Sequence, residues 1–302
     1  MKIKKIIFTL LTSFIITTGS HAGKIDLTII NAGAPGGTYS KLNDALIKDL
    51  GKFYNINVIG ADSESKGHKV FQSIEDRPVY VNSRTAFFSG VNVTKKEKPL
   101  INDSKKHYIV FAGKFNRAVC VQKNKDVDTL LFGKEQSLKI ASSDGVIFGK
   151  KFVAKLDAQT NSKHIMVPYN GSGKLIKGLI TGDVDIIVVN QGSAIKQWKD
   201  GNINCKYTTN PSSGQGLQPL YKKMQDPWAG FKLTYTLYGE VKNVSSSFAK
   251  DLNTRISQIL SDPNSNTTKK ISQLGWSSLI ADIEGLRKDW KESYQDTVDI
   301  LK

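Results

Sequence analysis

Apolar residues near the start of the chain follow first a strand pattern and then a helix pattern, with a glycine turn between them. The strand pattern covers Ile25 to Ala32 (IDLTIINA), and the turn after it contains Gly33, Gly36 and Gly37. A second strand pattern at residues 56–60 (INVIG) completes a βαβ unit, which predicts two parallel strands. The helix between the strands is predicted from the apolar residues at helical spacing, Leu42, Leu46, Leu50 and Phe53.

The same order of strand, turn and helix recurs twice in the middle of the chain. Both later turns are rich in serine and glycine, at residues 142–145 (SSDG) and 170–173 (NGSG). Three such corners predict an α/β fold. The strand patterns cover Ser137 to Ser142, His164 to Pro168 and Val184 to Val189, and the helical patterns cover Phe148 to Leu156 and Leu175 to Ile180.

The last third of the chain has an extended segment at Phe231 to Glu240, and only helical patterns follow it, at residues 248–260 and 286–301. We therefore expect the chain to leave a first lobe, build a second one and return to complete the first. The predicted boundaries assign residues 23–118 and 234–302 to lobe 1 and residues 119–233 to lobe 2.

The first 22 residues have the features of a signal peptide. Lys2, Lys4 and Lys5 precede the apolar run Ile6 to Ile16, and residues 20–22 (SHA) fit a small-x-small cleavage site. The run is well short of the roughly 20 residues that a spanning helix needs. No cysteine near this site could accept a lipid, so we expect a soluble protein exported to the periplasm.

The charge of the chain favours anionic surroundings but not nucleic acid. Removing the three signal lysines from the net charge of +16 leaves +13 on the mature chain. The lysines are scattered singly or in pairs, without an arginine-rich helix or an interleaved row of aromatic residues. We therefore expect a solvated basic surface and no nucleic-acid partner.

The two cysteines, Cys120 and Cys205, leave two alternatives open. In an oxidising compartment they could form a disulfide across about 85 residues, worth roughly 4–5 kcal/mol in the chain-entropy description. They could also be two buried free thiols, because the sequence does not fix their geometry.

The glycine corners are the candidate binding sites. A helix that follows such a corner leaves its first N–H groups free, with the positive end of the helix dipole behind them, and this arrangement binds carboxylates and phosphates. Asn190 follows the buried strand at Val184 to Val189, where ligands of α/β proteins commonly bind. The candidate residues are Gly36, Gly37, Thr38 and Ser40 in the first lobe, and Ser142, Ser143, Tyr169, Gly171, Ser172 and Asn190 in the second.

Each of these residues also has a purely structural explanation. Glycine turns and hydroxyl caps occur at ordinary helix starts, and they need no ligand. Tyr169 could simply pack beside Pro168, and Asn190 could simply make a turn.

Motifs for nucleotides, metals and catalysis are missing. Residues 171–174 (GSGK) lack the upstream glycine of a P-loop, and the mature chain contains no G-x-S-x-G motif. Its three histidines, His68, His107 and His164, form no zinc-binding pair. We therefore expect no cofactor, no metal and no enzymatic activity. A serine hydrolase with Ser142 or Ser143 as nucleophile is a weaker alternative, since it would need a base.

Three segments resemble the substrate-binding proteins of tripartite tricarboxylate transporters, the Bug family. The sharpest is VPYNGSGKLIKGLITGDVDIIVVNQGSAIKQWKDGNI (residues 167–203), which is similar to the family's Pro-Tyr-x-Gly and Gly-x-Val-Asp motifs. The other two are KIASSDGVIFGKKFVAKL (residues 139–156) and APGGTYS (residues 34–40). The resemblance implies two α/β lobes with mixed sheets, joined by two crossing segments around a central ligand cleft.

The resemblance also implies a function. Family members bind small carboxylates, including di- and tricarboxylates and acidic amino acids, and deliver them to membrane permease subunits. We therefore expect a monomeric periplasmic solute-binding protein with a small anionic ligand. A ligand sensor or a host-interaction protein on the same fold is the alternative.

One departure from the family concerns the ligand. Ser40 stands where many members carry an Asp three residues after the glycine pair, so an acidic residue that helps to read the ligand is missing. The identity of the carboxylate is therefore open within the resemblance.

Overall fold

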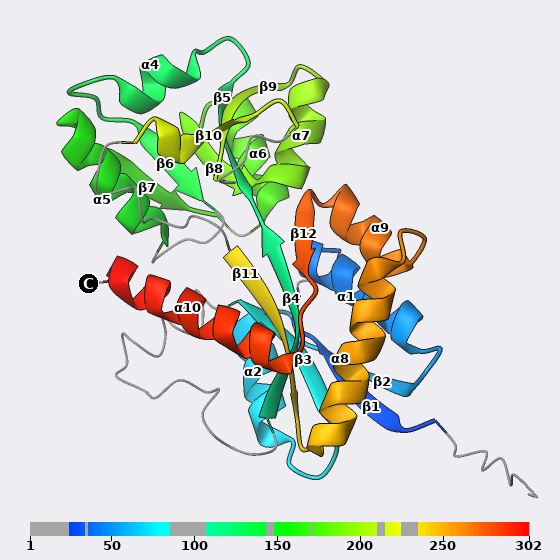
Figure 1. The fold of residues 1–302 in the computed structure, drawn as a ribbon. Coiled ribbons are helices and arrows are strands. Elements are labelled where there is room, and N and C mark those ends of the chain that lie inside the picture. Colours follow the sequence, from blue (N-terminus) through cyan, green and yellow to red (C-terminus); the bar gives the residue numbers. More distant parts are fainter. Residues whose placement is uncertain are drawn as a thin grey trace, which may run out of the picture.

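The computed structural model describes residues 24–33, 36–84, 107–142, 148–169, 171–209, 215–224 and 235–301. These residues form two α/β lobes, each built on a six-stranded mixed sheet (Figure 1). The predicted fold class is therefore confirmed. The predicted signal peptide at residues 1–22 lies outside the described residues.

The sheet of lobe 1 has the strand order β12-β4-β11-β3-β1-β2. β1 pairs in parallel with both β2 and β3, and β11 lies antiparallel between β3 and β4. The predicted βαβ unit at the start of the chain is therefore present. The strands are β1 (Asp26–Asn31), β2 (Asn55–Gly60), β3 (Val79–Arg84), β4 (His107–Phe115), β11 (Tyr235–Lys242) and β12 (Trp276–Leu279).

The sheet of lobe 2 has the order β10-β9-β5-β8-β6-β7. β6 lies between β7 and β8 and is parallel to both, whereas β5 is antiparallel to β8 and β9. The strands are β5 (Arg117–Gln122), β6 (Lys139–Ser142), β7 (Ile165–Pro168), β8 (Ile186–Asn190), β9 (Ile203–Thr208) and β10 (Gln218–Pro219).

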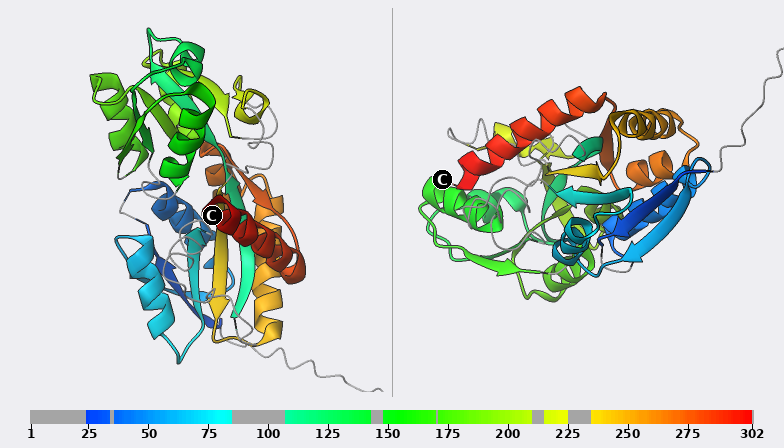
Figure 2. Two further views of the ribbon diagram at one scale, coloured as in Figure 1. Left: turned by 90° about the vertical axis from the view of Figure 1, so that its left-hand side faces the viewer. Right: turned by 90° about the horizontal axis from the view of Figure 1, so that it is seen from below.

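Helices cover both faces of each sheet (Figures 1 and 2). In lobe 1 they are α1 (Thr38–Leu50), α2 (Glu64–Ser73), α8 (Ser246–Ser261), α9 (Asn266–Gln273) and α10 (Ile283–Leu301). In lobe 2 they are α4 (Val127–Phe132), α5 (Phe148–Thr160), α6 (Ser172–Thr181), α7 (Gln191–Lys199) and the 3₁₀ turn η1 (Leu220–Lys222). Apolar residues at helical spacing bury one face of each long helix, as Leu42, Leu46 and Leu50 do on α1. Within the described ranges, no helix combines the length and the apolar character needed to cross a bilayer.

The chain crosses between the two sheets twice. It leaves lobe 1 after Phe115, at the end of β4, and β5 of lobe 2 begins at Arg117. It returns to lobe 1 between β10 of lobe 2, which ends at Pro219, and β11 of lobe 1, which begins at Tyr235. The predicted domain boundaries stay a proposal: the boundary at residue 118 falls within the first two residues of β5, and the boundary at residue 234 lies outside the described residues.

The expectation that only helices follow residue 240 is wrong. β12 lies between α9 and α10 and pairs antiparallel with β4, Trp276 opposite Phe115. Its four residues (WSSL) are too few to show a strand pattern, and the strand exists because it pairs with a partner about 160 positions earlier in the chain.

A disulfide joins Cys120 to Cys205. The two residues face each other on β5 and β9, with Cα atoms 4.1 Å apart, and both are buried. The bond links two central strands of lobe 2.

Candidate functional site

The topology turns the carboxyl ends of several strands toward the junction of the lobes. β4 is parallel to β1 and ends at Phe115, directly before the crossing, so β1 also ends on the side of lobe 2. In lobe 2, Arg117 lies opposite Asn190, so β8 and its parallel neighbours β6 and β7 end on the side of lobe 1. We call these two margins the facing edges. Helices that follow β1, β7 and β8 therefore begin at the junction.

The corner in lobe 1 is the start of α1 after β1. Gly36 has φ +70°, and a Cβ atom there would meet no other heavy atom within 4 Å. Gly37 is the N-cap of α1 and makes no side-chain cap hydrogen bond. Thr38, the first helical residue, is half-buried. The first N–H groups of α1 thus receive no acceptor from the cap residue.

The corner in lobe 2 is the start of α6 after β7. Gly171 is the N-cap with φ +90° and ψ 149°, a conformation that favours glycine, and it too provides no side-chain cap. Open space surrounds Gly171 and Gly173, since an added Cβ at either would meet nothing within 4 Å. Ser172 is the half-buried first helical residue.

Six other helices have a conventional side-chain cap. In each of them the residue before the helix accepts a hydrogen bond from a backbone N–H of the first turn. These caps are Ser63 for α2, Asp126 for α4, Asn190 for α7, Ser245 for α8, Ser265 for α9 and Asp282 for α10. The uncapped glycine starts of α1 and α6 therefore differ from these six, and both lie at the facing edges.

Two of the polar side chains predicted for the site make hydrogen bonds within the protein. The hydroxyl oxygen of Ser40 is buried and accepts a hydrogen bond from Asn31 Nδ2 at 3.3 Å, which ties α1 to β1. Asn190 accepts from the backbone N–H of Gly192 at 3.1 Å as the cap of α7. Ser142 is buried at the end of β6, and Ser143 lies outside the described residues.

Tyr169 follows β7, and its backbone N–H donates to the carbonyl of Ser142 at 3.3 Å. Its hydroxyl lies against Gly178, where an added Cβ would overlap it. The ring therefore packs along α6, the helix whose start forms the lobe 2 corner. Its role toward a ligand stays a prediction.

Sequence reasoning missed Arg117, which begins β5 at the facing edge. Its side chain is buried, with the guanidinium carbon 5.9 Å from the Phe115 ring centroid and Nη1 3.5 Å from the carbonyl oxygen of Val188. A guanidinium stays charged when buried, so Arg117 places a cationic group at this edge. The one signal was an arginine in an otherwise apolar strand (RAVCV).

The backbones of the two lobes touch beside the first crossing. A Cβ atom at Gly192, in α7, would overlap the carbonyl oxygen of Leu274, and one at Gly275 would lie 3.2 Å from Gly192 N. Gly275 has φ +66°. Because the preceding Gln191 N–H donates to Asn116 O at 2.9 Å, this contact adjoins the crossing segment.

The described histidines lie away from Ser142. His164 precedes β7, at the end opposite the facing edge, and its ring is hydrogen-bonded to Asp157. His107 begins β4 at the far end of lobe 1, where Nε2 lies 3.1 Å from Glu240 Oε2. His68 packs against Phe71, and burial lowers the pKa of its imidazole. The base that a serine hydrolase would need is therefore not supplied by these histidines.

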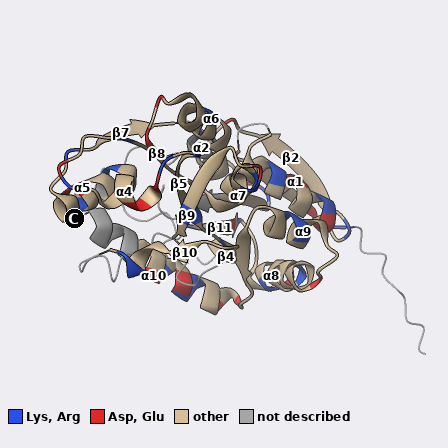
Figure 3. Cartoon of the chain, turned by 90° about the horizontal axis from the view of Figure 1, so that it is seen from above, with Lys and Arg blue, Asp and Glu red and all other residues tan. Residues whose placement is uncertain are grey.

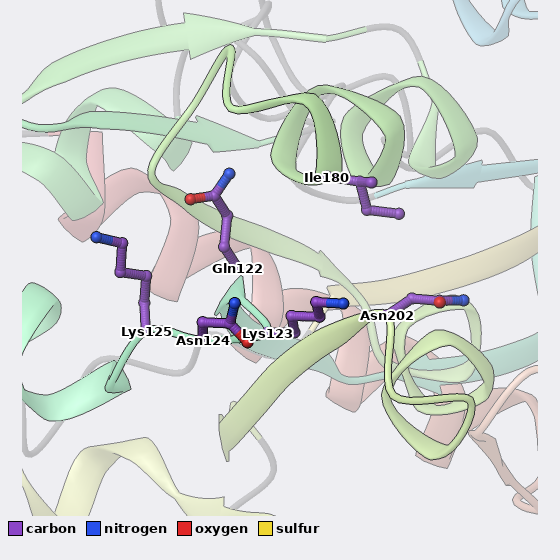
Figure 4. Close-up of a pocket in the computed structure, with 6 residues that line it drawn as sticks. All are labelled: Gln122, Lys123, Asn124, Lys125, Ile180 and Asn202. Atoms are coloured by element: carbon purple, nitrogen blue, oxygen red, sulfur yellow. The ribbon is translucent and has the colours of Figure 1, made fainter.

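A surface pocket of about 500 Å³ lies at the other end of lobe 2 (Figure 4). It is lined by Gln122, Lys123, Asn124, Lys125, Ile180 and Asn202. Gln122 ends β5, whose first residue is at the facing edge, so the pocket is a strand length away from both corners. Seen from above, the positions of Lys and Arg (blue) and of Asp and Glu (red) are scattered along the chain (Figure 3).

Comparison with known proteins identifies the fold. No family model and no curated protein matches the sequence. Several solved structures share the architecture over more than nine-tenths of this chain. Three of them are a TctC solute binding protein from Polaromonas (12% identity, TM-score 0.67, 93% of this chain and 99% of that one), the periplasmic binding protein BugD (13%, 0.67, 92% and 96%), and MatC from Rhodopseudomonas palustris with bound malate (16%, 0.66, 92% and 99%). The chain thus has the two-lobed fold of TctC- and Bug-type periplasmic binding proteins.

Proposed function

We propose that this protein is a periplasmic solute-binding protein that captures a small carboxylate between its lobes for a tripartite tricarboxylate-type transporter. The ligand class is a di- or tricarboxylate or an acidic amino-acid-like molecule. The carrying observation is the pair of uncapped glycine helix starts, at Gly37 and Gly171, on the facing edges. Backbone N–H groups at a helix start bind an anion without a charged side chain.

Two further observations support the proposal. The buried Arg117 places a guanidinium group at the edge of lobe 2. The Cys120–Cys205 disulfide is typical of an exported protein, because cytosolic thiols are kept reduced. Binding and release, rather than catalysis, are what this arrangement can perform.

Thermal unfolding of the purified protein with citrate, malate, adipate and glutamate tests the proposal. A carboxylate present at 100 times its dissociation constant should stabilise the folded state by about 2.7 kcal/mol. Native mass spectrometry before the screen would detect a co-purified carboxylate. If none of the four compounds raises the melting temperature and no carboxylate co-purifies, the proposed function is wrong.

Ser172→Asp tests the lobe 2 corner. A carboxylate at the first position of a helix interacts favourably with the helix dipole, so the variant should stay folded. It should repel an anion at the same N–H groups and weaken malate binding at least tenfold, measured by calorimetry. Ser246→Asp makes the same change at the first position of α8, which follows the far end of β11, and should bind as the wild type does. Equal binding by Ser172→Asp and wild type would remove this corner from the site.

A further inference from the structure

Trp276 lies at the junction of the lobes and packs against the lobe 1 corner. It is the first residue of β12 and is 7% exposed. Its ring stacks on Phe115 with centroids 4.8 Å apart, and the Tyr39 ring lies 5.9 Å away. Tyr39 is the second residue of α1, so the indole is beside the uncapped helix start.

The indole N–H of Trp276 is a buried donor without an acceptor. Nε1 has no hydrogen-bond partner among the residues that the structure describes. Buried tryptophan N–H groups usually have a partner, and an unpaired buried polar group is unfavourable. We therefore expect this N–H group to have an acceptor other than the residues that the structure describes.

The position of Trp276 indicates where that acceptor comes from. The preceding residue, Gly275, contacts Gly192 of lobe 2, so the indole borders the junction. The stack on Phe115, which itself precedes the crossing, holds the plane of the ring. An anion at the start of α1 would offer oxygen acceptors with several lone pairs.

We propose that Trp276 is a ligand-positioning residue, whose indole N–H donates a hydrogen bond to a carboxylate oxygen of the bound solute. This inference rests on the proposed function and adds a side-chain donor from lobe 1 to the backbone N–H groups. It also defines the ligand end at this corner as a hydrogen-bond acceptor.

Trp276→Phe keeps an aromatic ring in the stack and removes only the N–H. The variant should bind malate about tenfold more weakly in calorimetry, which corresponds to about 1.4 kcal/mol. Without malate it should melt at the same temperature as the wild type or higher, because the unpaired donor is gone. A purely structural role would instead lower the melting temperature and leave the affinity of the folded protein unchanged.

Trp290→Phe is the matched control. Trp290 is also buried and stacks on Tyr294 in α10, with centroids 5.3 Å apart, so this substitution should leave malate affinity unchanged. A second measurement needs no variant. In the wild-type protein the Trp276 indole ¹H–¹⁵N resonance should move downfield when malate is added.

The outcomes separate the two proposals. If the wild type binds malate while Trp276→Phe binds equally well and the indole resonance does not move, only the role of Trp276 is wrong. If no carboxylate binds the wild type, the proposed function and this inference are both wrong.

Discussion

The helix starts of α9 and α6 differ in whether the protein supplies an acceptor for their N–H groups. At α9, the carboxylate of Asp49 accepts hydrogen bonds from Thr267 N, Thr267 Oγ1 and Asn266 Nδ2, each at 2.8 Å. At α6, Gly171 offers no side chain and the space around it is open. At α9 the protein therefore supplies the carboxylate itself, from Asp49 on α1. Under the proposed function, a carboxylate of the bound solute takes at α6 the place that Asp49 takes at α9.

The largest effect that tests this comparison is expected at Asp49. Its side chain is fully buried on α1, and removing it in Asp49→Ala leaves the start of α9 with unsatisfied donors. We expect the free energy of unfolding to fall by about 3 kcal/mol, measured by chemical denaturation. Asp44→Ala, at an exposed position on the same helix, should change it by less than about 0.5 kcal/mol. Equal effects of the two variants would show that the start of α9 does not depend on its carboxylate.

The pH dependence of stability tests the charge state of Asp49. Burial raises the pKa of Asp49, but hydrogen bonds from Asn266 and Thr267 lower it more, so the net pKa lies below its ordinary value of 3.8. The ionised form is therefore stabilised in the folded state. This contribution is fully present above the unfolded pKa and is lost as the pH falls below 3.8 through the folded pKa.

Asp49→Asn isolates that contribution, because the amide does not titrate. The stability difference between wild type and variant should be constant near neutral pH and should shrink as the pH falls below 3.8. Denaturation curves at a series of pH values measure it. A difference that stays constant down to pH values well below 3.8 would contradict the assigned charge state.

Local patterns in the sequence predicted the first and the last of the three glycine corners, whereas most of the corner at residues 142–145 lies outside the described residues. Glycines at residues 36, 37 and 171, between a strand pattern and a helical face, do mark helix starts at Thr38 and Ser172. These features depend on neighbours within a few residues, which is why a single sequence shows them. The same patterns do not show whether a ligand binds at these corners.

Long-range features could not be predicted in this way. The pairing of β12 with β4, the burial of Arg117 and the contact of Gly192 with Gly275 all join residues more than 70 positions apart or depend on the packed lobes. Asn190 shows the ambiguity, since its place at a strand end fitted a ligand site and its side chain caps α7. The cap hydrogen bond is present in the structure, and the role of Asn190 toward a ligand stays a prediction.

The smallest effect is expected at the far pocket of lobe 2. Lys123 and Lys125 place two ammonium groups there, and if side-chain charge governed anion capture this pocket would be the binding site. β5 spans six residues, about 20 Å, between this pocket and the facing edge, which exceeds the screening length of about 8 Å at physiological salt. The double variant Lys123→Ala and Lys125→Ala should therefore leave the malate-induced rise in melting temperature unchanged. If the double variant loses that rise while Ser172→Asp binds malate as the wild type does, the anion binds at the far pocket. Solvated lysines, and not uncapped helix N–H groups, would then hold it.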